Sequence, residues 1–183
     1  MTKKAIVLLA EGFEEIEAMT PIDYLRRAGI EVTVVAIGGN LTVKGARGVS
    51  VNADMSLREI ETASFDAVVI PGGMPGAANL AASKETGALI AEAAAAGKLV
   101  CAICASPAVV LAPLGLLSGK KFTCYPGMEE KITDGKWADG SVIIDGNIIT
   151  SRGAGTAGVF AIAIIEFLLG EGEGKKIAEA VLL

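Results

Sequence analysis

Hydrophobic residues occur along the chain in two alternating patterns. Short, nearly continuous hydrophobic runs are typical of buried strands, and they occur at Ala5–Ala10, Glu31–Ile37, FDAVVIPGG (65–73), KLVCAIC (98–104), KKFTCYPG (120–127) and SVIIDGNIITS (141–151). Helical patterns follow most of them, at Glu14–Ala28, Lys84–Ala96, SPAVVLAPLG (106–115), Thr156–Gly170 and Lys175–Leu183. Strands that alternate with helices predict a mainly parallel sheet with helices on both faces. We therefore expect one doubly wound α/β domain over residues 1–183.

Residues that favour turns and caps refine these boundaries. The segment Lys44–Gly48 has the character of a hairpin turn, and Asp145-Gly146 is a second hairpin signal. In SPAVVLAPLG, Ser106 is expected as the N-cap and Pro107 as the first helical residue.

Two hydrophobic segments could be mistaken for targeting or membrane sequences. The run Ala5–Ala10 meets Glu11 after six residues, which is shorter than the roughly 7–15 residues of a signal peptide. The segment VFAIAIIEFLLG (159–170) is interrupted by Glu166 and is shorter than the roughly 20 residues that span a bilayer. We expect a first strand, a buried helix and a soluble cytoplasmic protein.

Charge and composition exclude several classes of site. The net charge is −5 and there is no long basic run, which argues against nucleic-acid binding. The chain has three cysteines and no histidine, so we expect no disulfide framework and no zinc site that needs imidazole. Three cysteines and a carboxylate could still bind a metal ion, but their spacing is not that of metal ligands, and no metal site is expected. The first loop lacks the G-x-G-x-x-G pattern, and GGMPGA lacks the ending of a phosphate-binding loop. No cofactor is therefore expected.

Ligands of doubly wound sheets bind beyond the carboxyl ends of the strands. Three loops have that position in the sequence: AEGFEE (10–15), PGGMPG (71–76) and CAICASP (101–107). The pair Gly72-Gly73 could form only a tight turn, or it could present backbone N–H groups that hold a developing oxyanion.

Cys104 is the candidate nucleophile. A free cysteine is usually a small buried hydrophobic residue, but Cys104 lies where a strand turns into a predicted helix. A helix N-terminus would lower the pKa of its thiol. Cys101 and Cys124 lack this setting and are expected in the core.

The spacing CAIC (101–104) also matches a redox-active C-x-x-C pair. Two residues three apart on one strand point to opposite faces, and their Cα atoms lie roughly 10 Å apart at about 3.3 Å per residue. A disulfide requires less than about 7 Å. The redox pair therefore requires a helix that already starts at Cys101.

The acidic segment EGFEEIE (11–17) lies just after the first predicted strand. Carboxylates suit a solvated helix start, and most of these residues are expected to have that role only. Pro21 cannot donate a hydrogen bond to the carbonyl of Glu17, so we expect a bent or strained helix beside the predicted site.

Four segments together resemble the ThiJ/PfpI family over almost the whole chain, in particular the branch of the Parkinson-disease protein (DJ-one) and its bacterial relatives. They are LLAEGFEEIEAMTPIDYLRRAGIEVTV, DAVVIPGGMPGAANL, AICASPAVVL and ITSRGAGTA. The resemblance implies a flavodoxin-like sandwich and a homodimer. It also implies that Cys104 is the reactive cysteine and that a protonated Glu17 faces it.

The same resemblance assigns further residues. The backbone amides near Gly73 and Ala105 complete the pocket, and Arg47 and Arg27 lie near the site and the dimer interface. This chain departs from the family at two positions. Protease-like members have a histidine directly after the reactive cysteine, where Ala105 stands here, and the DJ-one branch often has a histidine where this chain has Tyr125.

Three functions remain open from the sequence. The first is a glyoxalase or deglycase that acts on small dicarbonyls such as methylglyoxal, with Cys104 as the nucleophile and Glu17 as the proton shuttle. The second is a sensor or chaperone of oxidative stress in which Cys104 oxidises to a sulfinate. The third, an intracellular peptidase or amidase, is weakened by the missing histidines.

Overall fold

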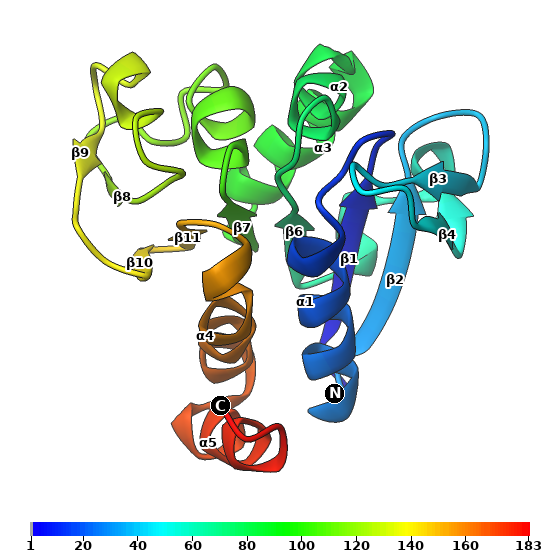
Figure 1. The fold of residues 1–183 in the computed structure, drawn as a ribbon, viewed down its shortest axis with the longest axis vertical. Helices are drawn as coiled ribbons and strands as arrows, with labels where there is room; N and C mark the ends of the chain where they lie inside the picture. The colour runs from blue at the N-terminus through cyan, green and yellow to red at the C-terminus, as the bar shows by residue number, and fades with distance from the viewer. Residues whose placement is uncertain (1) are drawn as a thin grey trace.

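The fold is built on a seven-stranded sheet in the order β10-β11-β7-β6-β1-β2-β5, shown in a computed structural model that describes residues 2–183 (Figure 1). The strands are β1 Lys4–Leu9, β2 Glu31–Ala36, β5 Met55–Ser56, β6 Ala67–Ile70, β7 Leu99–Ile103, β10 Val142–Asp145 and β11 Ile148–Ser151. All neighbours pair in parallel except β10 and β11, which form an antiparallel hairpin. The order β2-β1-β6-β7-β11 is that of a flavodoxin-like sheet, so the predicted fold class is confirmed.

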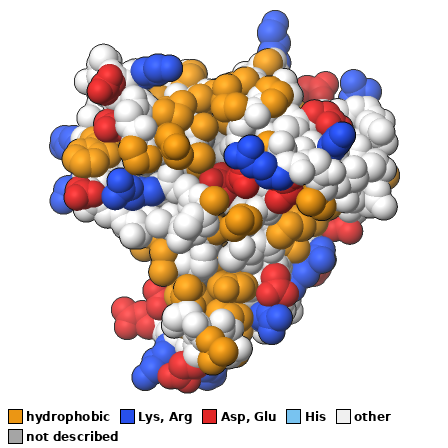
Figure 2. All heavy atoms as spheres, viewed as in Figure 1, with side chains coloured by type: hydrophobic (Ala, Val, Ile, Leu, Met, Phe, Trp, Pro, Cys, Tyr) orange, Lys and Arg blue, Asp and Glu red, His pale blue; other side chains and the backbone are white. Residues whose placement is uncertain are grey.

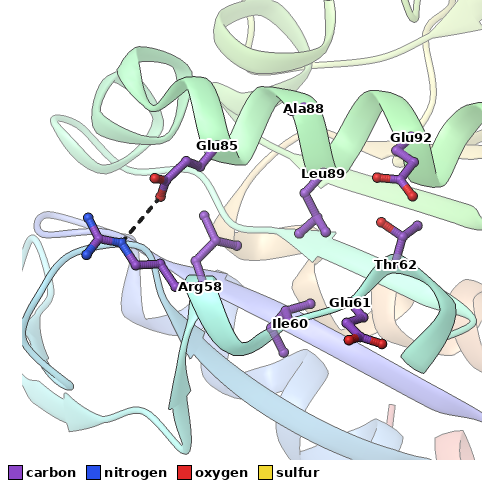
Figure 3. Close-up of a pocket in the computed structure, with 9 residues that line it drawn as sticks. Arg58, Ile60, Glu61, Thr62, Glu85, Ala88, Leu89 and Glu92 are labelled. Carbon is purple, nitrogen blue, oxygen red and sulfur yellow. Dashed lines mark ion pairs between the residues drawn. The ribbon is translucent and has the colours of Figure 1, made fainter.

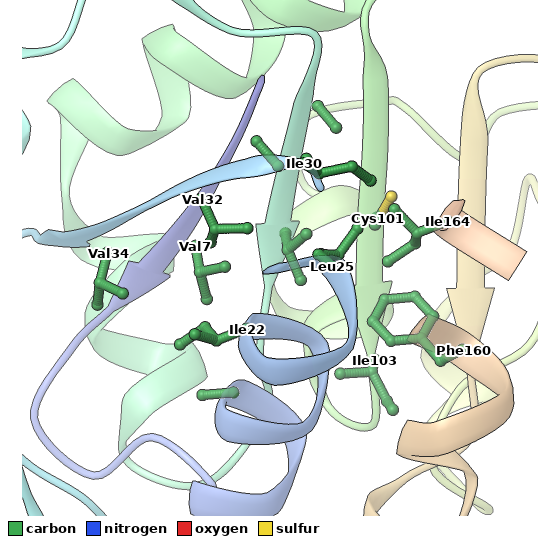
Figure 4. Packing of buried hydrophobic residues seen from close by; sticks show 14 of the residues in the cluster. Val7, Ile22, Leu25, Ile30, Val32, Val34, Cys101, Ile103, Phe160 and Ile164 are labelled. Carbon is green, nitrogen blue, oxygen red and sulfur yellow. The ribbon is translucent and has the colours of Figure 1, made fainter. Parts of the chain in front are cut away.

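Helices cover both faces of the sheet. One face packs against α1 Glu15–Arg27, α4 Ala157–Leu169 and α5 Glu171–Ala180, and the other against α2 Gly76–Ala82 and α3 Lys84–Ala95. In β1, Val7 and Leu9 belong to the first layer, whereas Ile6 and Leu8 belong to the second. Figure 4 shows Val7 among the residues of the first layer. This explains the continuous hydrophobic run, because every residue from Ala5 to Ala10 is buried on one side of the sheet or the other.

The helix boundaries differ in part from the predictions. Helix α1 lies within the predicted range Glu14–Ala28 and continues through Pro21. Helix α5 begins at Glu171, four residues before the predicted start, and the short helix α2 was not predicted.

The predicted hairpin at Lys44–Gly48 is confirmed, since β3 Thr42–Lys44 and β4 Ser50–Asn52 pair antiparallel. The predicted strand in KKFTCYPG is mostly wrong. Only β8 Lys121–Phe122 forms there, paired with β9 Lys136–Trp137. The strand does not continue beyond Phe122, because the next backbone N–H groups find other acceptors. The N–H of Thr123 donates to the hydroxyl of Thr150, and the N–H of Tyr125 donates to the carbonyl of Cys104.

The helix predicted after β7 is also different. It is a five-residue π-helical segment, Pro107–Leu111, followed by turns. Ser106 precedes it at the N-cap position and Pro107 is its first residue, as predicted, but the side chain of Ser106 makes no capping hydrogen bond. Its buried hydroxyl instead donates to the carbonyl of Pro71 at 2.6 Å. This bond joins the turn after β7 to the loop after β6.

The connections place the carboxyl ends of β1, β6, β7 and β11 at one edge of the sheet (Figure 1). The chain runs from β1 to β2 on one side and later returns to β6 on the other side. The switch in direction therefore lies between β1 and β6, where such sheets bind their ligands.

Within residues 2–183, no helix is long and apolar enough to cross a bilayer. The same residues contain no cluster of three cysteine or acidic side chains arranged to hold a metal ion.

Candidate active site

Cys104 lies at a strained corner directly after β7. Its φ angle is 65°, in the left-handed region that L-residues other than glycine rarely adopt. Such a conformation costs on the order of 1–3 kcal/mol and persists only where surrounding contacts hold it. Here the N–H of Cys104 donates to Ser151 at 2.9 Å, and its carbonyl accepts from Tyr125 at 2.8 Å. The corner predicted from the sequence therefore exists.

Glu17 faces the sulfur from the first turn of α1. Its side chain is only 1% exposed, and it forms a hydrogen bond with the thiol of Cys104. Its Oε2 also accepts from the N–H of Gly72 at 2.9 Å. The backbone N–H groups of Gly73 and Ala105 donate to the sulfur. A carboxyl group and two amides thus surround the thiol.

Burial changes the acidity of both groups. Desolvation raises the pKa of Glu17 from 4.5 to about 7, against the effect of its hydrogen bonds with Cys104 and Gly72. Desolvation, and then the negative charge of Glu17, raise the pKa of Cys104 to about 12, although the amides of Ala105 and Gly73 act to lower it. The predicted lowering of the thiol pKa by a helix N-terminus is therefore wrong. The five-residue segment after Cys104 provides too little dipole to outweigh burial.

These two groups lose their protons as a coupled pair. The pair loses one proton near pH 7 and the second near pH 12. Between these values one proton and one negative charge are shared by the sulfur and the carboxyl group. The form with a thiolate and a protonated Glu17 is one of the two arrangements of that charge state.

Two glycines allow this close approach. A Cβ on Gly72 would lie 2.6 Å from Oε2 of Glu17 and 2.7 Å from Cβ of Cys104. A Cβ on Gly73, whose φ is +89°, would lie 2.4 Å from the backbone nitrogen of Glu14. No larger residue fits at either position without moving the backbone.

The pair lies in an open cavity of about 660 Å³. Among its lining residues are Glu14, Glu17, Arg47, Gly73, Met74, Cys104, Ala105, Tyr125, Met128 and Ala154. Acidic and basic side chains meet in the middle of this face of the molecule, with hydrophobic side chains around them (Figure 2). The guanidinium of Arg47 lies 3.7 Å from the carboxylate of Glu14.

The structure brings most of the candidate residues together, but not all of them. Arg27 does not line the cavity, because it lies ten residues after Glu17 on α1, about 15 Å along the helix. It pairs with Asp23 instead. Cys101 lies on β7 and is fully buried in the core (Figure 4). The C-x-x-C pair therefore does not form, and both thiols are free.

Cys124 is 1% exposed and lies 3.9 Å from Glu129. Burial, followed by that carboxylate, raises the pKa of its thiol to about 12. Its hidden position agrees with the expectation of a core cysteine.

The sequence reasoning missed two contributors to the site. Gly153 lies beside Cys104 in the loop after β11, and Glu15 holds the hairpin that carries Arg47. Oε1 of Glu15 accepts from the backbone N–H of Arg47 at 2.7 Å and of Val49 at 3.3 Å. Gly153 could have been found from the sequence if the strand at 148–151 had been predicted to pair with the strand before Cys104. Neighbouring parallel strands end side by side, so the residues that follow them lie close together.

A second groove, of about 520 Å³, lies between α3 and the segment before β6 (Figure 3). Arg58 and Glu85 pair across it at 3.9 Å. Its lining includes Glu61 and Glu92 but no cysteine, so it does not offer the nucleophile of the first cavity.

The sequence and the fold of the chain are similar to those of known proteins. The model of the DJ-1/PfpI family matches residues 3–167. Protein DJ-1 homolog B of Arabidopsis thaliana is 43% identical over 182 residues, which cover 100% of this chain and 42% of that protein. The chain thus spans less than half the length of the two plant relatives that it matches.

Two further relatives match over nearly their whole length. A Caenorhabditis elegans protein named glutathione-independent glyoxalase DJR-1.2 is 39% identical over 171 residues, which cover 92% of this chain and 90% of that protein. The solved structure of oxidized Toxoplasma gondii DJ-1 has a TM-score of 0.96 and 41% identity, and covers 99% of this chain and 98% of that one. This chain belongs to the DJ-1/PfpI family.

Proposed function

We propose that the protein is a cofactor-independent enzyme that converts small α-dicarbonyls into hydroxy acids, for example methylglyoxal into lactate. The observation that carries the proposal is the hydrogen bond between the buried Glu17 and the strained Cys104. The name of the nematode relative, a glutathione-independent glyoxalase, supports the same reaction. A deglycase reaction would begin with the same attack on a carbonyl carbon.

In the first step, the thiolate of Cys104 attacks the aldehyde carbon of the substrate. The C–S bond forms while the π electron pair of the carbonyl moves to its oxygen. Protonated Glu17 gives its proton to that oxygen, which yields a hemithioacetal. The N–H groups of Gly73 and Ala105 are free to bond the oxyanion once the sulfur no longer carries the charge.

In the second step, the carboxylate of Glu17 removes the proton from the former aldehyde carbon. The electron pair moves to form an enediolate, whose oxygen on the second carbon takes the hydroxyl proton of the first carbon. Glu17 then returns its proton to the second carbon, which becomes an alcohol carbon, while the first carbon becomes a carbonyl carbon bound to sulfur. The product is a thioester of Cys104. Water cleaves the thioester, which releases the hydroxy acid and restores the thiol. One water is consumed, and no external oxidant or reductant is required.

Steady-state consumption of methylglyoxal with production of lactate tests the proposal. The wild type should turn over many times, and Cys104→Ser should lose at least about a hundredfold in kcat/KM, as expected for a nucleophile. Cys101→Ser is the matched control, because that thiol is fully buried in the core. Less than one lactate formed per wild-type chain would contradict the proposal.

The alternative is an oxidation sensor. It is favoured by the partial exposure of Cys104 and by the solved structure of an oxidized relative. Peroxide would then convert the thiol to a sulfinate, with Glu17 and the amides as hydrogen-bond donors to its oxygens. Mass spectrometry after two equivalents of peroxide, one for each oxygen atom transferred, would show 32 Da added at Cys104 in a protein that does not turn over dicarbonyls.

We also propose a homodimer, as the family resemblance implies. Ile16 and Val49 are more than half exposed, and the bond from Val49 to Glu15 places them near each other. Exposed hydrophobic residues that gather in this way are typical of an interface. Light scattering after gel filtration should give twice the chain mass, and the mass of a single chain would contradict this assignment.

A further inference from the structure

Gly153 lies beside the reacting groups of the site. Glu17 and the N–H groups of Gly73 and Ala105 are hydrogen-bonded to the Cys104 sulfur. A Cβ built on Gly153 would lie within 4.0 Å of both Sγ of Cys104 and Oε1 of Glu17. Because residue 153 has no side chain, a group attached to the sulfur has room to extend towards this loop.

We propose that Gly153 determines substrate specificity by keeping this side of the sulfur open. It admits α-oxoaldehydes whose second carbonyl carries a small, unbranched group, and it excludes bulky ones. The inference rests on the proposed function, because it names the substrates that the same thiol can accept.

The distances define how much room there is. A Cβ on Gly153 would lie 4.0 Å from Sγ of Cys104, 3.9 Å from Oε1 of Glu17 and 3.7 Å from Cδ2 of Tyr125. These are ordinary van der Waals contacts, so a methyl group fits in the resting enzyme. A C–S bond brings the attached carbon well inside 4 Å of the sulfur, so the methyl would crowd a substrate group that extends from this carbon towards residue 153.

The backbone at this position is fixed and accepts a side chain. Gly153 has φ 163° and ψ −170°, an extended conformation that any residue adopts. Its N–H donates to the hydroxyl of Thr156 at 3.1 Å, and its carbonyl accepts from the N–H of Thr156 at 2.8 Å. The hydroxyl of Thr156 also bonds that of Ser151 at 2.7 Å. Gly153→Ala therefore changes the open space without adding strain or charge.

Gly155 provides a matched control two residues later in the same loop. A Cβ there meets nothing within 4 Å, and the residue is exposed. Gly155→Ala should therefore leave the room around the sulfur unchanged.

The experiment compares glyoxal, methylglyoxal and phenylglyoxal as substrates. In Gly153→Ala, the ratio of kcat/KM for methylglyoxal to that for glyoxal should fall at least about tenfold, and the ratio for phenylglyoxal should fall further, as expected when a pocket loses the space of a methyl group. The same ratios should stay within about twofold of wild type in Gly155→Ala. Equal losses on all three substrates, or equal changes in the two variants, would overturn the proposal.

Alkylation of Cys104 keeps this inference testable if the wild type does not turn over dicarbonyls. The rate with N-ethylmaleimide relative to the rate with iodoacetamide, followed by mass spectrometry, should fall at least about tenfold in Gly153→Ala and not in Gly155→Ala. An unchanged ratio would refute the role of Gly153, whereas a lowered ratio without turnover would refute only the proposed enzyme.

Discussion

Replacement of Glu17 by glutamine should make the protein more stable above neutral pH. Glutamine has nearly the same shape as glutamate. Its oxygen can still accept from the N–H of Gly72, and its NH₂ group can still donate to the sulfur of Cys104. The substitution thus removes the ionisation of Glu17 and keeps its neighbours.

The size of the effect follows from the pKa of the buried carboxyl group. Glu17 has a pKa of about 7 in the folded protein and its ordinary 4.5 when unfolded. Between these values the folded state holds a proton that the unfolded state has lost, so the free energy of unfolding falls as the pH rises. At 1.36 kcal/mol per pH unit, the loss reaches about 3 kcal/mol above pH 7.

Urea unfolding at a series of pH values from 5 to 8 measures this difference. Relative to wild type, Glu17→Gln should gain about 2–3 kcal/mol between pH 5 and pH 8. Other ionisable groups are common to both proteins and cancel in the comparison. Glu171→Gln, at the exposed start of α5, controls for the change in net charge. Parallel curves for wild type and Glu17→Gln, or a relative loss of stability as the pH rises, would refute the assigned pKa.

Two further predictions concern the thiols and the phenol. Iodoacetamide at neutral pH, followed by peptide mapping, should label Cys104 faster than Cys101 or Cys124, because only Cys104 is partly exposed; faster labelling of either other cysteine would contradict its assignment as the nucleophile. Tyr125→Phe should lose less than about tenfold in dicarbonyl turnover, because a phenol near neutral pH supplies at most one modest hydrogen bond. A loss as large as that of Cys104→Ser would mean that Tyr125 acts as the base.

The sequence predicted the sheet well because its strands are buried on both faces. Val7 and Ile6 belong to opposite layers of the core, so the run around them is hydrophobic throughout. The segment 120–127 was harder, because Thr123 and Tyr125 satisfy their N–H groups with Thr150 and Cys104 rather than with a neighbouring strand. Local pattern carries no information about such long-range partners.

Some features of the candidate site could likewise be predicted from the sequence, and others could not. The corner at Cys104 was visible because a hydrophobic strand ends there and small residues follow. The raised pKa of the Cys104 thiol could not be predicted, because it depends on the burial of the site and on how close Glu17 lies to the sulfur. Gly153 was missed for a similar reason, since its importance lies in the space that it leaves beside a residue 49 positions earlier in the chain.

The proposed reaction requires a group that exchanges a proton near neutral pH, and this chain has no histidine to provide it. Burial gives Glu17 a pKa of about 7, close to the ordinary value of histidine. A cysteine paired with glutamate nevertheless differs in net charge from a cysteine paired with histidine. An imidazolium and a thiolate are neutral together, whereas a protonated carboxyl and a thiolate carry one negative charge. The amides of Gly73 and Ala105 are the groups that offset this charge. The reactive form therefore accumulates as the pH rises through about 7, and dicarbonyl turnover should increase over the same range.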